Sequence, residues 1–536
     1  MIMKQQERAS SKVCRFGNSR IQFLVLLLLI CGLSNRDLYA AKPNIIVVLA
    51  DDLGYGDLAC YGHKVIKTPH LDQFAKQGLR LTSCYAAAPN CSPSRAGLMT
   101  GRTPYRVGIH NWIPNMSPMH VSKKEITIAT LLRNAGYATC HVGKWHLNGR
   151  FNLPGQPQPS DHGFDYWFST QNNALPTHHY PDNFVRNGKP VKIHRRWIRP
   201  DGSQRKTPSR HPANGHPPEE YAAHLVVDEA IYWLGHERNK QKPFFMYVCL
   251  HEPHEPIASA KPYLELYPGS KHPTYAAHHG NVTQMDAAFG RLMGTLKKLN
   301  LEKNTLVIFT SDNGPAITRR HPHGSAGPLR DKKGSVYEGG IRVPGIIRWP
   351  GHVNAGTVSD EPVSGVDLLP TLCEVTGISP PRDRTLDGAS WLPVLQGKPI
   401  PRKTPLYWQF NVARGKPKVA MRDGDWKILA TLTGPVIKPF GDIRAGDQRA
   451  IKTAELKSFE LYNLKNDIGE TRELSQQEPE QFRKLVAKLR KKYREVRDES
   501  PTWPAWTWPR IEGKRITEFY KAEAEYQRKR KLKSMR

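Results

Sequence analysis

The sequence predicts an α/β fold in which a large domain with a mainly parallel sheet precedes a smaller α+β domain with an antiparallel sheet. Between residue 43 and about residue 400, short apolar runs alternate with helical patterns, which is typical of parallel strands connected by helices. After Lys403 the apolar runs become shorter, which is typical of antiparallel strands. A length of 536 residues exceeds what one hydrophobic core usually serves, so we expect two domains.

The predicted divisions follow these changes along the chain. Residues 1–40 form a leader, residues 41–403 the large domain and residues 404–510 the smaller domain. Residues 511–536 form a basic tail, which we expect to be frayed and solvated from Arg528 onward.

Each predicted element has its own pattern. Near-continuous hydrophobic runs indicate strands that are buried on both faces of a sheet. Such strands are expected at residues 44–50, 244–250 and 305–311, and a fourth, at 341–349, is interrupted by two arginines. Helical periodicity covers residues 127–136 and 282–299, and residues 151–220 are expected to be long loops over a site. In the smaller domain, strands are expected at residues 406–410, 418–421, 426–429 and 459–462, before a polar helix over 479–496.

The leader has the layout of a secretory signal peptide. A basic stretch precedes an apolar run over residues 21–30, and Ala40 ends a plausible cleavage site. A single transmembrane anchor is the alternative, but the run is well short of the roughly 20 residues that cross a bilayer. We therefore expect export to a periplasm, the extracellular space or a lysosome-type lumen, without stable membrane insertion after cleavage.

The charge of the chain indicates an anionic partner. The formal net charge is +31, and about +27 remains after the leader, which holds six basic and two acidic residues. Nucleic acid, an anionic membrane or a polyanionic glycan could account for such a charge. The sequence has no usual nucleic-acid-binding module, so we expect no nucleic-acid partner. For an exported protein a sulfated polysaccharide is the natural polyanion; improved solubility is the simpler alternative.

Oxygen donors follow two of the predicted strands. Asp51 and Asp52 come directly after the first strand, and Asp312 and Asn313 come after the third. Ligands bind beyond the carboxyl ends of strands in open α/β sheets, so these side chains are expected at one edge. Calcium takes six to eight such oxygens, whereas zinc prefers His or Cys. One Asp pair is often only a helix cap, but two pairs in one sheet favour a calcium site.

Histidines and a lysine reach the same edge. The strand at 244–250 leads into His251 and His254, and residues 139–142 lead into Lys144 and His146. Imidazoles serve as general acids or bases near neutral pH, and a lysine supplies a point charge for an anionic ester.

Cys91 begins the segment with the most specific chemistry. It precedes a predicted helix with Pro93 in the first turn and Arg95 nearby, an arrangement that binds anions and lowers a thiol pKa. This pattern first suggests a cysteine nucleophile. However, three residues between Cys and Arg are too few for a loop that wraps a phosphate. A buried structural cysteine would leave the polar neighbours unexplained. The other cysteines after the leader show no paired spacing, so neither a disulfide framework nor a zinc site is expected.

The segment C-x-P-x-R followed by A-G-L-M-T-G-R, residues 91–102, resembles the formylglycine signature of the type I sulfatases, the arylsulfatase and N-acetylgalactosamine-6-sulfatase family. The resemblance covers nearly all of residues 43–400, in the family's order. Its other motifs lie at residues 51–57, 143–147, 311–314, 329–334 and 338–344.

The resemblance implies a fold similar to alkaline phosphatase, with a large mixed sheet flanked by helices. It implies hydrolysis of sulfate esters on a sulfated carbohydrate similar to N-acetylgalactosamine 6-sulfate. Cys91 would be oxidised to formylglycine by a formylglycine-generating enzyme. The aldehyde hydrate would attack sulfur and form a covalent sulfo-enzyme intermediate, which collapses back to the aldehyde.

The resemblance also implies roles for individual residues. Arg95 would steady the formylglycine, and Lys144 and Lys333 would bind the sulfate oxygens. His146 would take the proton that lets the intermediate collapse, and a further histidine would bind substrate and protonate the leaving alcohol. The implied calcium ligands are Asp51, Asp52, Asp312, Asn313 and the formylglycine at position 91.

Two of these assignments have competitors. Both His251 and His254 precede a proline, and the His254-Glu255-Pro256-Ile257 spacing favours His254 as the acid. Lys332 competes with Lys333, and the following Gly334 favours Lys333.

Two other functions are compatible with the resemblance. One is a formylglycine-dependent phosphodiesterase or phosphonate hydrolase, and the other is an inactive glycan-binding relative. The intact set of Cys, Arg, Lys, His and acidic residues argues against inactivity.

Overall fold

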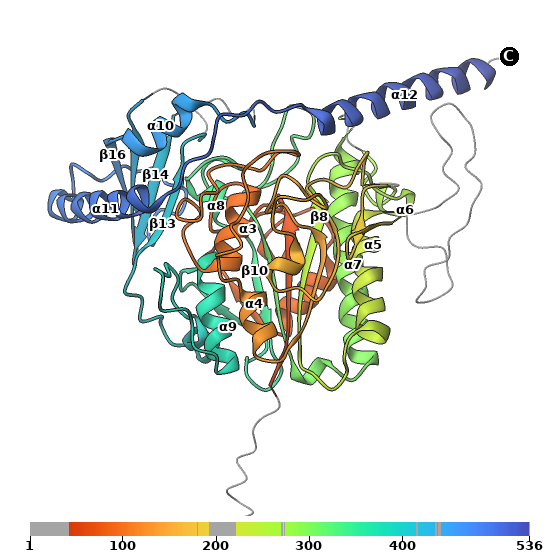
Figure 1. The fold of residues 1–536 in the computed structure, drawn as a ribbon, viewed down its shortest axis with the longest axis horizontal. Helices are drawn as coiled ribbons and strands as arrows, with labels where there is room; N and C mark the ends of the chain where they lie inside the picture. The colour runs from red at the N-terminus through yellow and green to blue at the C-terminus, as the bar shows by residue number, and fades with distance from the viewer. Residues whose placement is uncertain are drawn as a thin grey trace, which may run out of the picture. The chain divides into compact units, whose positions relative to one another are not determined.

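A computed structural model describes residues 42–178, 181–191, 221–269, 272, 274–413, 416–434, 437 and 441–534. The predicted leader, residues 1–40, lies outside these described residues. Residues 43–536 form one compact unit (Figure 1). No helix in the described part of the chain combines the length and the apolar character needed to span a membrane.

A ten-stranded sheet forms the centre of this unit, in the order β11-β2-β10-β9-β1-β8-β4-β5-β6-β7. Its five central strands β9, β1, β8, β4 and β5 run parallel, while β10, β6 and β7 add antiparallel pairings toward the edges. The strands are β1 (Asn44–Asp51), β2 (Leu79–Leu81), β4 (Ala138–Lys144), β5 (Tyr166–Thr170), β6 (Val185–Arg186), β7 (Lys189–Pro190), β8 (Phe244–Pro253), β9 (Thr305–Ser311), β10 (Gly345–Arg348) and β11 (Thr357–Ser359).

Both faces of the sheet are covered by helices, which explains why β1 is hydrophobic at nearly every position. Alternate residues of β1 enter different cores, with Ile45 and Val47 on one face and Ile46 and Val48 on the other. The first face packs against α3 (Cys91–Thr100), α4 (Ile128–Asn134) and α9 (Leu368–Thr376), and the second against α2 (Pro69–Lys76), α5 (Ala222–Tyr232) and α7 (Tyr275–Lys298). The predicted α/β class with a mainly parallel sheet is confirmed.

Three strand predictions hold closely, and two regions differ. The predicted strands at 44–50, 244–250 and 305–311 are β1, β8 and β9. Within the predicted strand at 341–349, only β10 is a strand, and it runs antiparallel to β9. The predicted segment begins within α8 (Glu338–Ile341). The prediction of loops throughout 151–220 is wrong at β5, which pairs parallel with β4. Residues 192–220 of that region lie outside the described residues.

The second sheet is antiparallel and has four strands in sequence order, as predicted for the smaller domain. Its strands are β13 (Leu406–Phe410), β14 (Lys418–Asp423), β15 (Trp426–Leu432) and β16 (Leu456–Asn463). The helix α11 (Pro479–Glu499) packs Leu485 and Leu489 against it. A short helix, α10 (Ala445–Thr453), lies between β15 and β16.

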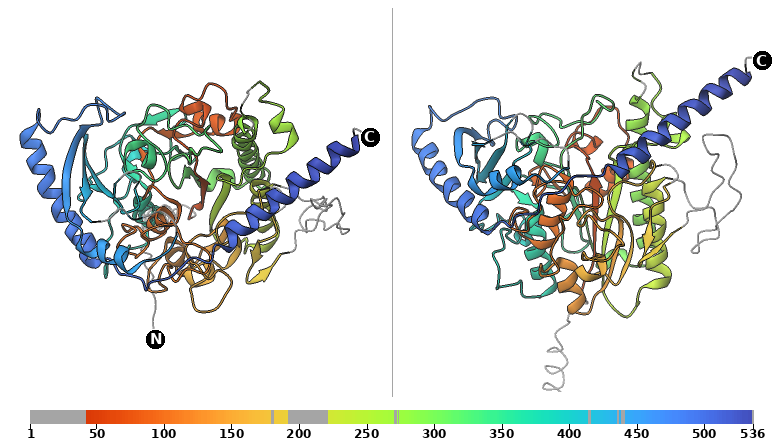
Figure 2. Two further views of the ribbon diagram at one scale, coloured as in Figure 1. Left: turned by 90° about the horizontal axis from the view of Figure 1, so that it is seen from above. Right: turned by 45° about the horizontal axis from the view of Figure 1, so that its top comes forward.

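The end of the chain differs from the predicted frayed tail. Residues from Ile511 to Ser534 form one helix, α12, which includes the segment from Arg528 that we expected to be frayed (Figure 2). Its first turn carries the buried side chain of Glu512, so at least the beginning of this helix packs against the rest of the unit.

Candidate active site

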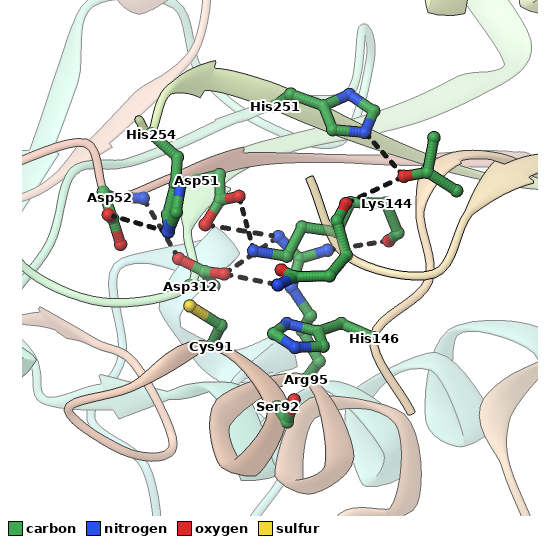
Figure 3. A network of polar contacts seen from close by, with 12 residues as sticks. Asp51, Asp52, Cys91, Ser92, Arg95, Lys144, His146, His251, His254 and Asp312 are labelled. Carbon is green, nitrogen blue, oxygen red and sulfur yellow. Dashed lines mark hydrogen bonds and ion pairs between the residues drawn. The ribbon is translucent and has the colours of Figure 1, made fainter. Parts of the chain in front are cut away.

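The predicted site residues lie together at the carboxyl ends of the central parallel strands (Figure 3). Asp51 is the last residue of β1, Lys144 is the last residue of β4, and Asp312 directly follows β9. His254 follows β8 by one residue. Parallel strands of one sheet therefore place carboxylates, an imidazole and an ammonium group at one edge.

Cys91 is the first residue of α3, a helix in which all ten residues are buried. The side chain of Asn90 caps this helix and accepts a hydrogen bond from the Cys91 amide at 2.9 Å. The Cys91 Sγ lies 3.3 Å from the Nζ of Lys333. The first turn of α3 thus holds the thiol beside an ammonium group.

Arg95 links three parts of the site from one turn further along α3. Its Nε donates to Asp312 Oδ2 at 3.0 Å, and its Nη1 donates to the Lys144 carbonyl oxygen at 2.9 Å. The Arg95 side chain is fully buried, which favours a guanidinium because it can satisfy several acceptors at once. Arg95 therefore fixes the end of β4 against the residue that follows β9.

Two lysines pair with different carboxylates of the site. The Nζ of Lys144 lies 2.7 Å from Asp51 Oδ2, and the Nζ of Lys333 lies 2.5 Å from Asp52 Oδ1. Lys332, the sequence competitor of Lys333, instead donates to the Ile317 carbonyl oxygen at 2.7 Å. Lys333 therefore contacts Cys91, as predicted, whereas the Lys332 ammonium group is bound to a backbone carbonyl oxygen.

Close backbone packing positions Lys144. Gly143 has a φ of +100°, and a Cβ atom added there would lie 1.8 Å from the Cys249 carbonyl oxygen on β8. Only glycine fits this position. Asp52 and His146 also have left-handed backbones, with φ values of 67° and 56°. Such conformations are uncommon for residues with a side chain and cluster at functional sites.

Several oxygens of the acidic set lack hydrogen bonds. Asp51 Oδ1, Asp52 Oδ2 and Asn313 Oδ1 are buried, and none accepts a hydrogen bond from the described residues. Ligand atoms of Asp51, Asp52, Cys91 and His254 lie within 4.8 Å of one another. Buried oxygens without hydrogen bonds are costly, and a hard cation would satisfy them. The donor set therefore fits a calcium ion.

The charges around these oxygens support the same interpretation. Burial, followed by the neighbouring charge of Asp51, raises the pKa of Asp312 to about 7. Burial also acts to raise the pKa of Asp51, but the positive charges around it, chiefly Lys144, outweigh burial and hold that pKa well below its usual range. A divalent cation would relieve the repulsion between these carboxylates.

The histidines differ in position. His254 borders the cavity above Cys91, and its Nε2 lies 3.6 Å from Asp52 Oδ2. His251 is fully buried outside that cavity, with Nε2 2.8 Å from Thr170 Oγ1. His146 also borders the cavity, and its Nε2 lies 3.1 Å from the Ile113 carbonyl oxygen. Of the two candidate acids, only His254 faces the cavity.

A cavity of about 540 Å³ opens above Cys91. Part of its lining was missed by sequence reasoning. Phe410 is the last residue of β13, a predicted strand whose pattern gives no sign of a site. The others come from loops and from the end of the chain, where no periodicity or motif marks them: Asn90, Asn111, Trp112, Asn172, Asn173, Val412, Trp508, Glu512, Gly513 and Ile516. The predicted residues Cys91, His146, His254 and Lys333 lie at the same cavity.

Comparison with known proteins identifies the family. Residues 43–378 match the family described as "Sulfatase", and residues 329–434 match "N-sulphoglucosamine sulphohydrolase, C-terminal". The chain is 36% identical to N-acetylgalactosamine-6-sulfatase of Rattus norvegicus over 397 residues, covering 72% of this chain and 71% of the relative. It is 33% identical to arylsulfatase A of Homo sapiens over 471 residues, covering 83% and 85%.

Solved structures agree with the fold. The structure of "Ps i-CgsB in complex with k-i-k-neocarrahexaose" is similar with a TM-score of 0.71 and 28% identity, covering 91% of this chain and 99% of that one. The phosphonate monoester hydrolase of Agrobacterium radiobacter shares the fold at a TM-score of 0.57 and 21% identity, covering 85% and 96%. On the strength of the family match and its sulfatase relatives, the chain belongs to the sulfatase family and is a sulfuric ester hydrolase.

Proposed function

We propose that this sulfatase removes sulfate from carbohydrate esters, using a formylglycine made from Cys91 and a calcium ion held by Asp51, Asp52, Asp312 and Asn313. One observation carries the proposal. The Cys91 side chain borders a 540 Å³ cavity beside Lys333, His146 and His254, next to buried carboxylate oxygens that lack hydrogen bonds. This arrangement suits an anionic ester whose sulfur must approach position 91.

The unmodified thiol is a poor nucleophile in this environment. Burial raises the pKa of Cys91 to about 12, although Lys144 and Lys333 act in the opposite direction. Almost no thiolate would therefore exist at neutral pH. Oxidation to formylglycine by a maturing enzyme supplies a hydrated aldehyde, whose hydroxyl oxygen can attack sulfur.

The cations of the site have complementary tasks. Lys333 lies beside Cys91, where it can bind a non-bridging sulfate oxygen, and Lys144 adds a second buried ammonium group. Arg95 donates hydrogen bonds to Asp312 and to the Lys144 carbonyl oxygen, and so fixes the positions of these two residues. Donors fixed in advance stabilise charge that develops in the transition state. Calcium supplies Lewis-acid polarisation of a sulfate oxygen when it is bound.

Two histidines can move protons at the cavity. Burial lowers the pKa of His146 well below its usual value, so its neutral imidazole can accept a proton. Burial also lowers the pKa of His254, which makes its protonated form a stronger acid toward a departing alcohol oxygen. We assign His146 as the base and His254 as the acid that also binds substrate.

The substrate class follows from the relatives and from the charge. Relatives are named N-acetylgalactosamine-6-sulfatase, and one similar structure is described as a complex with k-i-k-neocarrahexaose. The strongly basic chain suits a polyanionic glycan, and the leader suits export before such a polymer is met. We therefore propose an exported enzyme that acts on a sulfated glycan similar to N-acetylgalactosamine 6-sulfate.

The test uses the chain produced together with a formylglycine-generating enzyme. We expect sulfate release from 4-nitrophenyl sulfate and from N-acetylgalactosamine 6-sulfate, and only slow cleavage of an aryl phosphodiester or phosphonate ester. Peptide mass spectrometry should find an aldehyde at position 91. Cys91→Ala should abolish turnover, whereas Cys84→Ala, a buried cysteine away from the cavity, should retain it.

Two results would contradict the proposal. A fully active enzyme that carries only a free thiol at Cys91 would exclude the formylglycine. A higher kcat/KM for phosphodiesters or phosphonate esters than for sulfate esters would favour the alternative hydrolase function.

A further inference from the structure

The last part of the chain forms one wall of the active-site cavity. Trp508, Glu512, Gly513 and Ile516 line it together with Cys91. All four lie beyond residue 434, where the matches to the sulfatase family descriptions end. Figure 2 shows the segment before α12 passing over this end of the unit. This wall therefore lies outside the region that the two family descriptions match.

Specific contacts hold the segment in place. The Trp503 Nε1 donates to the Gly108 carbonyl oxygen at 2.6 Å, and Trp506 forms a backbone bridge with Ile443. The rings of Trp508 and Trp112 meet edge to face with centroids 5.1 Å apart. These contacts order the segment without any substrate.

A second cavity of about 300 Å³ adjoins the first at Asn172, Asn173 and Glu512, which line both. Amide side chains dominate its polar lining, and Phe151, Leu153 and Ile511 add apolar surface. Leu153 and Ile511 are 45% and 46% exposed. A volume near 300 Å³ is at the small end of ligand sites. The cavity therefore suits one compact unit with both polar and apolar faces.

The residues shared by the two cavities have unused hydrogen-bonding capacity. Asn172 donates to the carboxylate oxygens of Glu512 at 3.3 and 3.2 Å. Asn172 Oδ1 and Asn173 Oδ1 are buried and accept no hydrogen bond from the described residues. Buried acceptors of this kind require donors, and sugar hydroxyls are such donors. Their position at the junction favours a ligand that spans both cavities.

We infer that the second cavity binds the sugar unit adjacent to the sulfated one, so that the enzyme recognises a sulfated oligosaccharide across Asn172, Asn173 and Glu512. This inference rests on the proposed function. It adds a subsite and a preference for substrates of at least two sugar units.

Charge defines which neighbouring unit fits. Lys333 and His254 line only the first cavity. Among the described residues, Arg515 is the one cation that lines the second cavity. Its Nη2 lies 2.7 Å from Asp182 Oδ1. Glu512 adds a buried carboxylate there. A second anionic unit would face that carboxylate without an available counter-charge, so the neighbouring unit should be uncharged.

The experiment compares three substrates that carry the same sulfate ester. These are N-acetylgalactosamine 6-sulfate, its disaccharide with galactose, and its disaccharide with glucuronic acid. We expect kcat/KM to be about tenfold higher for the galactose disaccharide than for the monosaccharide. The glucuronic acid disaccharide should gain less, because its carboxylate meets Glu512.

Matched variants locate the effect. Leu153→Trp fills the second cavity, and we expect it to bring the disaccharide-to-monosaccharide ratio of kcat/KM to about one. Asn115→Ala, which removes an amide from the same cavity, should lower that ratio less. Leu266→Trp is the control, because Leu266 is similarly exposed, at 39%, and lines neither cavity.

The outcomes separate this inference from the proposed function. Equal kcat/KM for all three substrates, or an unchanged ratio in Leu153→Trp, would overturn the second subsite while the sulfatase function stands. Turnover of 4-nitrophenyl sulfate with no turnover of any of the three sugars would also overturn it. Failure on 4-nitrophenyl sulfate as well would overturn the proposed function and this inference with it.

Discussion

Two buried clusters of carboxylates and cations in this protein have similar composition but differ in how fully their carboxylate oxygens are paired. The active-site cluster contains Asp51, Asp52, Asp312, Arg95, Lys144 and Lys333, and the interface cluster contains Glu338, Arg342, Lys427 and Glu470. The interface cluster joins α8 to the β15 strand of the second sheet. Both hold carboxylates and cations in the protein interior, where an unpaired charge is costly.

In the interface cluster a cation or a hydrogen-bond donor lies within 2.9 Å of every carboxylate oxygen. Lys427 Nζ lies 2.8 Å from Glu338 Oε1 and 2.9 Å from Glu470 Oε1. Tyr85 donates to Glu338 Oε2 at 2.6 Å, and the Glu338 amide donates to Glu470 Oε2 at 2.7 Å. In the active-site cluster, by contrast, Asp51 Oδ1 and Asp52 Oδ2 accept no hydrogen bond from the described residues, and their ion pairs with Arg95 Nη2 and His254 Nε2 are long, at 3.8 and 3.6 Å. The interface cluster is thus satisfied within the fold, whereas the active-site cluster leaves oxygens for the calcium ion proposed above.

The largest effect is expected from breaking the complete cluster. Lys427→Met would leave Glu338 and Glu470 buried without their shared cation. Removing one partner of a buried pair costs about 3–5 kcal/mol, so we expect a large fall in Tm in thermal unfolding. Lys261→Met is the control, because the exposed pair with Glu265 should contribute almost nothing. A similar Tm for both variants would contradict the structural role of the interface cluster.

The open cluster should respond differently. Asp312→Asn keeps an oxygen acceptor for Arg95 but removes one charge from the calcium site. We expect kcat/KM to fall roughly hundredfold or more, and the rise in Tm on adding calcium to metal-stripped protein to disappear. The Tm of the metal-stripped protein should fall much less than in Lys427→Met. Full turnover by metal-stripped wild-type enzyme would show that no calcium completes this cluster.

A smaller effect should separate the two histidines at the carboxyl end of β8. His254 faces the cavity, whereas His251 is buried against Thr170. If His254 protonates the leaving oxygen, His254→Ala should lower kcat/KM for a sugar sulfate about tenfold more than for an aryl sulfate, since an aryl oxygen leaves without a proton more readily. His251→Ala should lower both equally. Equal losses in His254→Ala would argue against its role as the acid.

Sequence reasoning anticipated the catalytic half of the protein better than the rest. The strands β1, β8 and β9 are continuous apolar runs, and the acids and histidines lie at or just beyond their carboxyl ends, so strand ends alone indicated one edge. Motifs then specified Cys91 and Arg95. Strand β5 was missed because it is short and lies in a segment rich in loop-forming residues.

The missed cavity residues have a different cause. Trp508 and Glu512 reach the cavity through contacts with residues hundreds of positions away, such as Trp112 and Asn172. Neither periodicity nor a strand end marks such positions, because tertiary packing alone decides them. The same holds for Lys427, which lies within a strand pattern and is buried only because α8 brings Glu338 to it.

The smallest expected effect is the pH dependence of the stability contributed by Glu338 and Glu470, the two carboxylates that share Lys427. Burial opposes ionisation of Glu338, but Lys427, Arg342 and Arg422 outweigh it and lower its pKa to about 2. Burial, aided by the charge of Glu338 and opposed by Lys427, raises the pKa of Glu470 to about 7. The two residues therefore contribute to stability with opposite pH dependence.

Glu338 contributes stability above its unfolded pKa of about 4.5, and this contribution is lost only as pH falls toward 2. Glu338→Gln should thus destabilise the fold equally at pH 6 and pH 8. The contribution of Glu470 is complete below pH 4.5 and is lost as pH rises through 7. Because Gln does not titrate, Glu470→Gln should gain about 1 kcal/mol relative to wild type between pH 6 and pH 8, measured by denaturant unfolding. If the stability difference between Glu470→Gln and wild type does not change with pH, the Glu470 carboxyl stays ionised over this range. Glu338 and Glu470 would then both be ionised in the interface cluster.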